Sequence, residues 1–345
     1  MSKRNLNKVQ KSAVESFGKP VLIFAGAGSG KTRVLTHKIA HLIDKDLVSA
    51  QNILAVTFTN KAAQEMRERV SKLLKNKNTS VNLGTFHSIC ARILRKEIHH
   101  LGYTADFSIF DVKDQVTLVK VVLEAMDIPK NYVTPQEVRH KISYFKNKLI
   151  HPDEAQSKAH LVIEKTYAEI YKNYQKALFE NNAVDFDDLL ILPLQLFEKN
   201  PKVLEKYRED WQYILVDEYQ DTNKPQFMLI KYLAGSHKQV CVVGDDDQSI
   251  YGWRGADIRN ILDFEKTFGN CEVFKLEKNY RSSGHILEAA SSVVKNNDNR
   301  APKELIAHND VGEKLGLIET HDEMEEADAV VNALEKEIKL EKRNF

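Results

Sequence analysis

Five short apolar runs constrain the fold of this chain more than any other feature. Each run is four or five residues long and rich in Val, Ile and Leu, and most are followed by sequence with helical periodicity. Strands of a parallel sheet that helices cover on both faces have this composition. The pattern predicts an α/β fold with right-handed crossovers. Its strands are expected at Val21–Ala25, Ile53–Thr57, Tyr213–Val216, Val240–Val243 and Glu272–Leu276.

This alternation stops between about residue 86 and residue 199. Apolar residues there recur at helical spacing without a strand-like run, in segments such as Asp111–Met126, Pro135–Lys148 and Glu154–Asn181. We therefore expect an all-helical subdomain inserted into the α/β core, which resumes near Trp211.

A separate unit is expected after about residue 277. A helix is predicted at Ser282–Lys295, a strand at Lys314–Ile318 and a charged helix at Glu323–Lys339. These residues are too few for an α/β domain of their own. We expect them to be the start of a second domain, in a chain that is cut short.

Composition is typical of a soluble globular protein, with 42% hydrophobic and 29% charged residues in a chain of 345. The first residues contain no apolar run of signal-peptide or membrane-spanning length, so a cytoplasmic protein without a membrane partner is expected. Cys90, Cys241 and Cys271 lack the spacing of zinc ligands, and buried reduced thiols are expected.

Charge is unevenly distributed along the chain. Residues 1–100 contain 18 Lys and Arg against 6 Asp and Glu, whereas the remaining residues contain 32 against 43. A basic first section suits a polyanion such as ATP or a nucleic acid. A solvated basic surface remains the alternative explanation.

A glycine-rich loop follows the first predicted strand and precedes helical sequence. Glycines let backbone N–H groups converge on an anion at a helix N-terminus. Lys31 is expected on the β- and γ-phosphates of a nucleotide and the Thr32 hydroxyl on Mg²⁺. Ala25 stands where the strict phosphate-loop pattern has Gly, but the strand–loop–helix context supports the assignment. The loop residues are Ala25, Gly26, Ala27, Gly28, Ser29, Gly30, Lys31 and Thr32.

Two carboxylates directly follow the strand Tyr213–Val216. Acidic residues at the carboxyl end of a buried parallel strand lie where open α/β sheets bind ligands. Asp217 is suited to hold Mg²⁺ through water, and Glu218 is suited to orient and deprotonate an attacking water.

The strand Val240–Val243 is followed by polar and aromatic residues. A neutral Gln248 beside a phosphate site can sense the γ-phosphate by hydrogen bonding. Tyr251, Trp253 and Arg254 supply stacking and cationic surfaces of the kind that grip single-stranded nucleic acid. On these residues alone, Trp253 fits a packing anchor equally well.

These three segments, in this order, resemble the Rep/UvrD/PcrA family of superfamily 1 DNA helicases. Further strings of the same family are present, and the wording around Gly244–Gln248 and Asn279–Gly284 is most similar to its Rep branch. The resemblance extends from residue 6 to about residue 300. The further strings are Leu6–Gln10, Thr57–Met66, Gly84–Ser88, Val184–Leu189 and Leu276–Ser283.

The resemblance implies roles for further residues. Gln10 would read the adenine edge, Arg33 and Tyr280 would sandwich the base, and Arg281 would act as an arginine finger on the γ-phosphate. Lys278 departs from the family, whose close members usually have Gln there. The single-stranded DNA track would be lined by Phe58, Asn60, Thr85, His87, Tyr251, Trp253 and Arg254.

The resemblance also implies the architecture. A RecA-like motor domain would comprise residues 1–84 and 190–277, with the helical subdomain at 85–189 and part of a second RecA-like domain at 278–345. ATP would bind between the two motor domains, and its hydrolysis would move them along DNA.

The function implied is that of an ATP-dependent DNA helicase or translocase, with 3′ to 5′ polarity. Its partners would be single-stranded DNA, DNA junctions and replication or repair proteins. The later family motifs, including a second arginine finger, are missing from these residues, so we expect weak Mg–ATP binding, very slow turnover and little or no unwinding. A nucleotide-gated single-stranded DNA-binding module without much catalysis therefore remains an alternative. A GTPase is disfavoured, because no Asn-Lys pair is followed by Asp two residues on.

Overall fold

A six-stranded parallel sheet forms the centre of the computed structural model, which describes residues 6–75, 80–235, 237, 239–298 and 300–341. All five predicted strands are present, and the one at Val240 extends to Gly244. The sequence pattern missed the edge strand β3, because its sequence Asn-Leu-Gly-Thr has a single large apolar residue. In spatial order the strands are β3 (Asn82–Thr85), β2 (Ile53–Thr57), β6 (Tyr213–Val216), β7 (Val240–Gly244), β1 (Val21–Ala25) and β8 (Glu272–Leu276).

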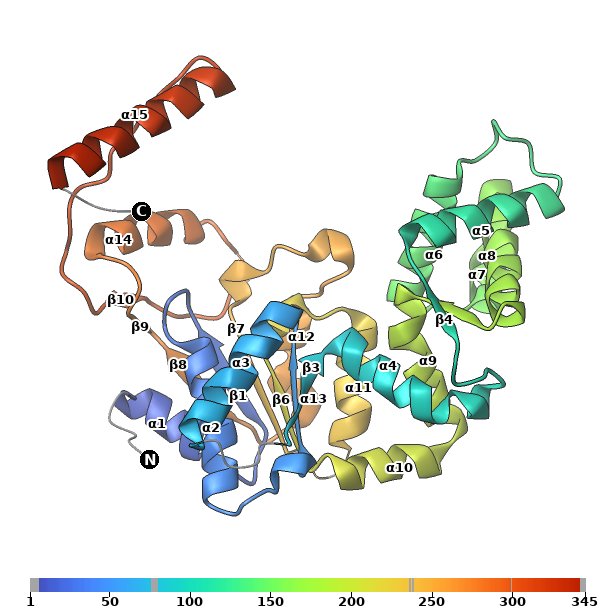
Figure 1. The fold of residues 1–345 in the computed structure, drawn as a ribbon, viewed down its shortest axis with the longest axis horizontal. Helices are drawn as coiled ribbons and strands as arrows, with labels where there is room; N and C mark the ends of the chain where they lie inside the picture. Colours follow the sequence, from blue (N-terminus) through green and yellow to red (C-terminus); the bar gives the residue numbers. More distant parts are fainter. Residues whose placement is uncertain (1–5, 76–79, 236, 238, 299, 342–345) are drawn as a thin grey trace.

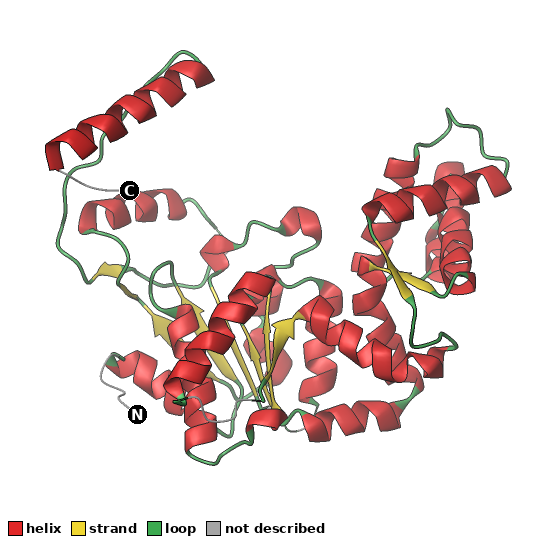
Figure 2. Cartoon of the chain, viewed as in Figure 1, coloured by secondary structure: helices red, strands yellow, loops and turns green. Residues whose placement is uncertain are grey.

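Alternate strand residues face two separate apolar layers. In β1, Val21, Ile23 and Ala25 belong to one layer, and Leu22 and Phe24 belong to the other. The four central strands β2, β6, β7 and β1 are buried on both faces, and a fully buried aliphatic side chain of this size contributes about 1.5–3 kcal/mol. The first layer is covered by α1 (Lys8–Glu15), α2 (Lys31–Asp44) and α3 (Asn60–Leu73) (Figures 1 and 2).

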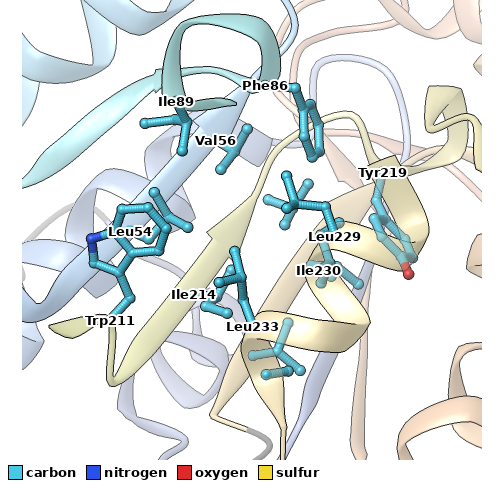
Figure 3. Close-up of a cluster of buried hydrophobic side chains, with 14 of the residues drawn as sticks. Leu54, Val56, Phe86, Ile89, Trp211, Ile214, Tyr219, Leu229, Ile230 and Leu233 are labelled. Atoms are coloured by element: carbon cyan, nitrogen blue, oxygen red, sulfur yellow. The ribbon is translucent and has the colours of Figure 1, made fainter. Parts of the chain in front are cut away.

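The second layer is shown in Figure 3, where Trp211 and Tyr219 lie at opposite ends of a cluster of aliphatic side chains. Phe86 and Ile89 of α4 join this cluster, so that helix packs directly against the sheet. The helices of this layer are α4 (Phe86–Glu97), α9 (Phe186–Lys199), α10 (Pro201–Asp210), α11 (Lys224–Ala234), α12 (Arg259–Leu262) and α13 (Phe264–Phe268).

The inserted subdomain is predominantly helical and has an apolar core of its own. It also contains a short parallel pair, β4 (Ser108–Phe110) with β5 (Ala183–Asp185), which corrects the expectation that it is entirely helical. In Figure 1 this lobe stands apart from the sheet. Its helices are α5 (Val112–Ala125), α6 (Pro135–Asn147), α7 (Pro152–Lys158) and α8 (Val162–Glu180).

A buried charge cluster joins this lobe to the rest of the protein. The Lys146 ammonium at the end of α6 lies 2.7 Å from both Asp185, the N-cap of α9, and Asp188 in the first turn of that helix. Burial alone would lower the pKa of Lys146, but the two carboxylates outweigh it and raise the pKa well above its usual value. The cluster therefore fixes α6 against α9, which also packs on the sheet.

Residues after β8 lie at the other edge of the sheet from the helical lobe (Figure 1). The two predicted helices are present as α14 (Gly284–Val294) and α15 (Glu323–Glu341). The predicted strand Lys314–Ile318 is wrong, since this segment has no regular structure. Leu317 is 92% exposed there, and an apolar run forms a strand only where a neighbouring strand accepts its hydrogen bonds. The pairing found here is between β9 (Lys278–Asn279) and β10 (Ile306–Ala307).

Cys90 and Cys241 are buried and Cys271 is half-buried, and all three are free thiols. The expectation of a buried thiol is therefore wrong for Cys271, whose Sγ lies 3.6 Å from Glu265 at the protein surface. Among the described helices, none combines the length and apolar character needed to cross a lipid bilayer.

Candidate nucleotide site and nucleic-acid groove

Three loops that follow neighbouring strands meet to form the candidate nucleotide site. β6, β7 and β1 are adjacent and parallel, so their carboxyl ends lie at one edge of the sheet. Ligands bind at this edge in open α/β sheets. The fold thus brings together three segments that are distant in the sequence.

The glycine-rich loop after β1 has the backbone shape of an anion cradle. Gly28 and Gly30 have φ of 67° and 95°, in the region that favours glycine. Gly30 is the N-cap of α2 and makes no side-chain cap hydrogen bond, so the first N–H groups of the helix remain available to an anion. Ser29 stabilises the loop by donating its hydroxyl to the Gly26 carbonyl at 2.7 Å.

Lys31 joins the three loops. Its ammonium lies 3.3 Å from Glu218 Oε2 and donates to Gln248 Oε1 at 3.3 Å. The Lys31 side chain is 12% exposed, which keeps its charge in a largely dry environment. Lys31 therefore contacts both Glu218 and Gln248, and these three residues were predicted from separate motifs.

The two carboxylates after β6 have different environments. Asp217 is buried, and burial followed by the nearby Glu218 charge raises its pKa to about 7, against the opposing effect of Lys31. Glu218 is part-exposed and has a left-handed backbone with φ of 49°. Such a conformation in a non-glycine residue is strained and is found at functional sites.

The oxygen donors at this site suit magnesium. Mg²⁺ prefers carboxylate and hydroxyl oxygens together with phosphate and water. Lys31 and Glu218 are the charged neighbours of the buried Asp217 carboxylate, whose pKa is raised. A divalent cation would therefore stabilise the charged form of Asp217. Thr32, in the first turn of α2, supplies the hydroxyl. The donor set therefore fits the predicted metal.

Gln10 and Tyr280 lie beside the phosphate loop. The Gln10 amide donates to the Ser29 carbonyl at 2.9 Å and accepts from Asn7 N at 3.0 Å. Asn7 in turn donates its side-chain amide to the Tyr280 hydroxyl at 3.0 Å. Arg33 follows on the exposed side of α2. The residues predicted to surround the base therefore share one end of the site, where His308 also packs edge-on against Tyr280.

Asn279 anchors the segment that carries Arg281. This role of Asn279 was not predicted from the sequence. Its side chain donates to the Ala27 carbonyl at 2.6 Å and accepts from the backbone N–H groups of Arg281 and Ser282, each at 2.8 Å. Tyr280 N also donates to the Gly28 carbonyl at 3.0 Å. The Arg281 side chain is exposed next to the loop. The signal in the sequence was the Asn itself, which favours such turns.

A groove of about 920 Å³ lies between the sheet and the helical lobe; we call it the aromatic groove. It collects residues from segments far apart in the sequence. Five of the seven predicted DNA-contacting residues line it, namely Phe58, His87, Tyr251, Trp253 and Arg254.

Trp253 projects into solvent and is 75% exposed, so the alternative that it is a packing anchor is wrong. The Arg254 guanidinium lies 4.4 Å from the centroid of the Trp253 ring and 5.2 Å from that of Tyr251. Flat rings and a cation are thus presented together, as a single strand of nucleic acid requires.

The remaining predicted contacts have other immediate roles. Thr85 caps α4, its hydroxyl accepting from Ser88 N at 3.2 Å, and Asn60 begins α3; both lie outside the described lining of the groove. Burial lowers the pKa of His87, which is therefore neutral at pH 7 and would contact a ligand by hydrogen bonding or stacking. Phe58 packs edge-on against Phe86.

One wall of the aromatic groove comes from α6. The sequence predicted a helix there but no role for it in binding. Arg139, His140, Ser143 and Tyr144 contribute to the lining. The pairs Arg139/Ser143 and His140/Tyr144 are four residues apart, and that spacing places each pair on one helix face. Phe186 lies outside the described lining, but its ring is 50% exposed and its centroid lies 5.9 Å from that of His87, which does line the groove.

Comparison with known proteins agrees with this geometry. Residues 6–269 match the family model of the UvrD/REP helicase N-terminal domain, and residues 274–344 match that of the UvrD-like helicase C-terminal domain. The chain is 48% identical over 333 residues to ATP-dependent DNA helicase PcrA of Staphylococcus epidermidis, covering 96% of this chain and 46% of the relative. It is 48% identical over 332 residues to PcrA of Staphylococcus aureus, with the same coverage.

The chain therefore spans about half the length of the curated relatives it matches. The match nonetheless includes the phosphate loop, the Asp217–Glu218 pair, the Gln248 loop and Asn279–Arg281, all of which lie inside the two matched ranges. With most of its residues matched by the N-terminal domain model, the chain belongs to the UvrD/Rep family of helicases.

Proposed function

We propose that this chain is the nucleotide-binding part of an ATP-dependent DNA translocase in which hydrolysis drives movement along single-stranded DNA. The observation that carries the proposal is that Lys31 lies 3.3 Å from both Glu218 and Gln248, and that Gln248 stands three residues before Tyr251, which lines the aromatic groove. One short loop, 245–254, thus touches both a phosphate site and a stacking surface. A motor requires that coupling.

Each side chain in the nucleotide site has a role that its environment supports. Lys31 would neutralise the β- and γ-phosphates, and Gln248 would exchange its Lys31 contact for one to the γ-phosphate. Glu218 would orient and deprotonate the attacking water, because it is the more exposed of the two carboxylates. Arg281 would supply the arginine finger, positioned through Asn279.

Magnesium would be held by Asp217 and Thr32, and when bound it neutralises charge on the phosphates. At the other end of the site, Arg33 and Tyr280 would enclose the base and Gln10 would read its edge. The Gln10 amide already donates to the phosphate loop and its carbonyl accepts from Asn7 N, so its second N–H and the second lone pair of its carbonyl would face the adenine.

Family membership supports several finer proposals. We propose 3′ to 5′ movement, DNA junctions as substrates, replication or repair proteins as partners and a cytoplasmic location. We also propose that residues 1–84 and 190–277 form one RecA-like motor domain, that residues 85–189 are its inserted subdomain, and that residues 278–345 belong to a second RecA-like domain.

An ATP hydrolysis assay with and without single-stranded oligonucleotides tests the proposal. We expect single-stranded DNA to stimulate ATP turnover, and we expect Lys31→Ala to abolish that turnover. Salt-sensitive DNA binding that responds to a non-hydrolysable nucleotide, without any turnover, would favour the second candidate, a nucleotide-gated DNA-binding module. Absence of both nucleotide and DNA binding would contradict both functions.

A further inference from the structure

The three consecutive carboxylates Asp245–Asp247 lie at the carboxyl end of β7, and the side chain of Lys303 lies among them. Lys303 Nζ is 2.8 Å from Asp245 and 2.7 Å from Asp247, and it also contacts Asp246. The Lys303 side chain is 4% exposed and the three aspartates are 0–8% exposed. The carboxylates therefore already hold a cation, which explains why so many acidic groups can be buried together.

The segment around Lys303 makes further contacts with the same aspartates. Arg300 forms a bidentate pair with Asp247, with N–O distances of 3.0 and 2.9 Å. The backbone N–H of Ala301 donates to Asp246 at 2.6 Å. Burial alone would lower the pKa of Lys303, but the aspartates outweigh it and raise the pKa. Residues 300–303 are thus fixed to the end of β7 by charge and backbone contacts.

This cluster is connected to the nucleotide site through Gln248. The Gln248 side-chain amide donates to Asp245 Oδ2, while its carbonyl accepts from Lys31. A second path runs through the Gln220 side chain. Its amide N–H donates to Glu218 at 3.0 Å, and its Oε1 accepts from Asp245 N at 2.9 Å. Asp245 is therefore shared between the nucleotide site and Lys303.

The segment that follows Lys303 contacts the phosphate loop and pairs with the strand that precedes Arg281. Two residues after Lys303, Leu305 lies against Gly26, where an added Cβ would come within 2.4 Å of it. Ile306–Ala307 form β10, which pairs with β9, and β9 ends at Asn279. Asn279 holds the backbone of Arg281. A continuous set of contacts thus joins Lys31, Gln248, Asp245, Lys303, the β9–β10 pair and Arg281.

We propose that Lys303 is a positioning residue that transmits the contact state of Gln248 to the β9–β10 pair and so to Arg281. The proposal rests on the proposed function and extends it. When a γ-phosphate replaces Gln248 as the partner of Lys31, the Gln248 amide changes its hold on Asp245. The Asp245–Lys303 pair then shifts, and residues 300–307 move with it, because the buried pair cannot exchange with water at low cost.

Hydrogen–deuterium exchange of the whole chain, with and without Mg²⁺ and a non-hydrolysable ATP analogue at saturation, tests the relay. In the native protein we expect the analogue to slow exchange by about tenfold in the phosphate loop, residues 26–33, and in residues 300–308. Lys303→Met should keep the response in the phosphate loop and lose it in residues 300–308. Lys303→Arg, which retains the charge, should restore it.

Two further variants keep the test decisive. Gln248→Ala removes the link between Lys31 and Asp245 but leaves Lys303 and its three aspartates in place, and it should give the same loss even where Lys303→Met does not fold. Lys295→Met removes an exposed lysine of the same unit and should change nothing. A response at 300–308 that survives both Lys303→Met and Gln248→Ala overturns the relay.

The native protein separates this proposal from the proposed function. A protected phosphate loop without any response at 300–308 overturns the relay and leaves ATP binding intact. An unprotected phosphate loop overturns ATP binding and the relay together.

Discussion

The nucleotide site and the aromatic groove share one loop but are built by opposite means. In the candidate nucleotide site, polar side chains are already paired within the protein: Lys31, which is 12% exposed, contacts both Glu218 and Gln248. In the groove, the main surfaces are exposed side chains, and Trp253 is 75% exposed. The first region is pre-organised around fixed charges, whereas the second presents rings to solvent.

This difference suits the two tasks of the proposed function. Phosphoryl transfer needs charges that are held in place before the reaction, because reorganising them raises the barrier. Movement along a strand needs contacts that accept any base and release it again, which stacking on exposed rings provides. Substitutions in the first region should therefore abolish a step, and substitutions in the second should weaken binding gradually.

The largest effect is expected for Lys31→Ala. Removing this cation leaves Asp217 and Glu218 without their shared positive neighbour and the phosphates without a partner. Turnover should fall by about 10²–10³ or more, and nucleotide affinity should fall with it. Titration with a fluorescent nucleotide and a steady-state ATPase assay measure both.

Lys45→Ala is a matched control for that variant, since Lys45 is an exposed lysine at the opposite end of the same helix. Unchanged affinity and turnover in Lys31→Ala would refute the phosphate-loop assignment. Loss of folded structure in Lys31→Ala, seen by circular dichroism, would show that Lys31 is structural.

Glu218→Gln should separate binding from hydrolysis. The amide keeps the size of the side chain and its hydrogen bonding but cannot accept a proton from water, so turnover should fall by about 10²–10⁴ while Mg–ATP still binds. Single-turnover kinetics and nucleotide titration test this. Glu209→Gln, an exposed carboxylate on α10, is the control. Lost nucleotide binding with surviving turnover would rule out Glu218 as the base.

The two tryptophans of the chain give the sharpest contrast for the groove. Trp253→Ala should weaken single-stranded DNA binding by about 1–3 kcal/mol with little dependence on base identity. Its melting temperature should barely change, because the side chain is exposed. Fluorescence titration with labelled oligonucleotides and calorimetry measure the two quantities.

Trp211→Ala should behave in the opposite way. Trp211 is 7% exposed and lies in the core shown in Figure 3, so its loss should cost about 3–5 kcal/mol of unfolding free energy. The folded fraction should still bind DNA normally. A destabilised Trp253→Ala protein with normal DNA affinity would instead make the Trp253 loop structural.

Arg254→Ala should change the salt dependence of binding. If its guanidinium contacts a backbone phosphate, the slope of log affinity against log salt should flatten by about 0.7 on a single strand. Titrations at several salt concentrations measure that slope. Arg69→Ala, an exposed arginine on α3, is the control. An unchanged slope would mean that Arg254 serves only to support the rings of Tyr251 and Trp253.

The smallest expected effect concerns pH. Burial and Glu218 raise the pKa of Asp217 to about 7 from an ordinary 3.8, so the folded state holds this proton after the unfolded state has released it. The contribution of the Asp217 proton to the free energy of unfolding is fully present below about pH 4 and is lost as pH rises through 7. Asp217→Asn should flatten this decline and raise the melting temperature at pH 8 by a few degrees.

The same substitution should weaken magnesium-dependent nucleotide binding, because an amide carries no charge for the metal. Native affinity for Mg–ATP should strengthen between about pH 6 and pH 8 as Asp217 loses its proton. Thermal melts and nucleotide titrations across that range test both halves. A native protein whose affinity stays flat across this range would argue against Asp217 as the metal ligand.

Local structure was predicted correctly from the sequence wherever consecutive residues determine it. The phosphate loop, the Asp217–Glu218 pair and the strands β1, β2, β6, β7 and β8 each consist of consecutive residues whose pattern has one physical explanation. Buried strands must be apolar on both faces, and a phosphate cradle must be rich in glycine. Family membership followed from the same strings and was confirmed by the family models.

Tertiary structure decided what depends on a distant partner. The segment Lys314–Ile318 has the composition of a strand but has no neighbouring strand among the described residues, whereas the polar β3 is a strand because β2 pairs with it. Trp253 could have been core or surface until its 75% exposure was known. The sequence analysis made no prediction for Lys303, and only the folded chain places it among three aspartates nearly sixty residues away. Long-range pairing and burial are set by what lies across the fold, and local pattern does not specify them.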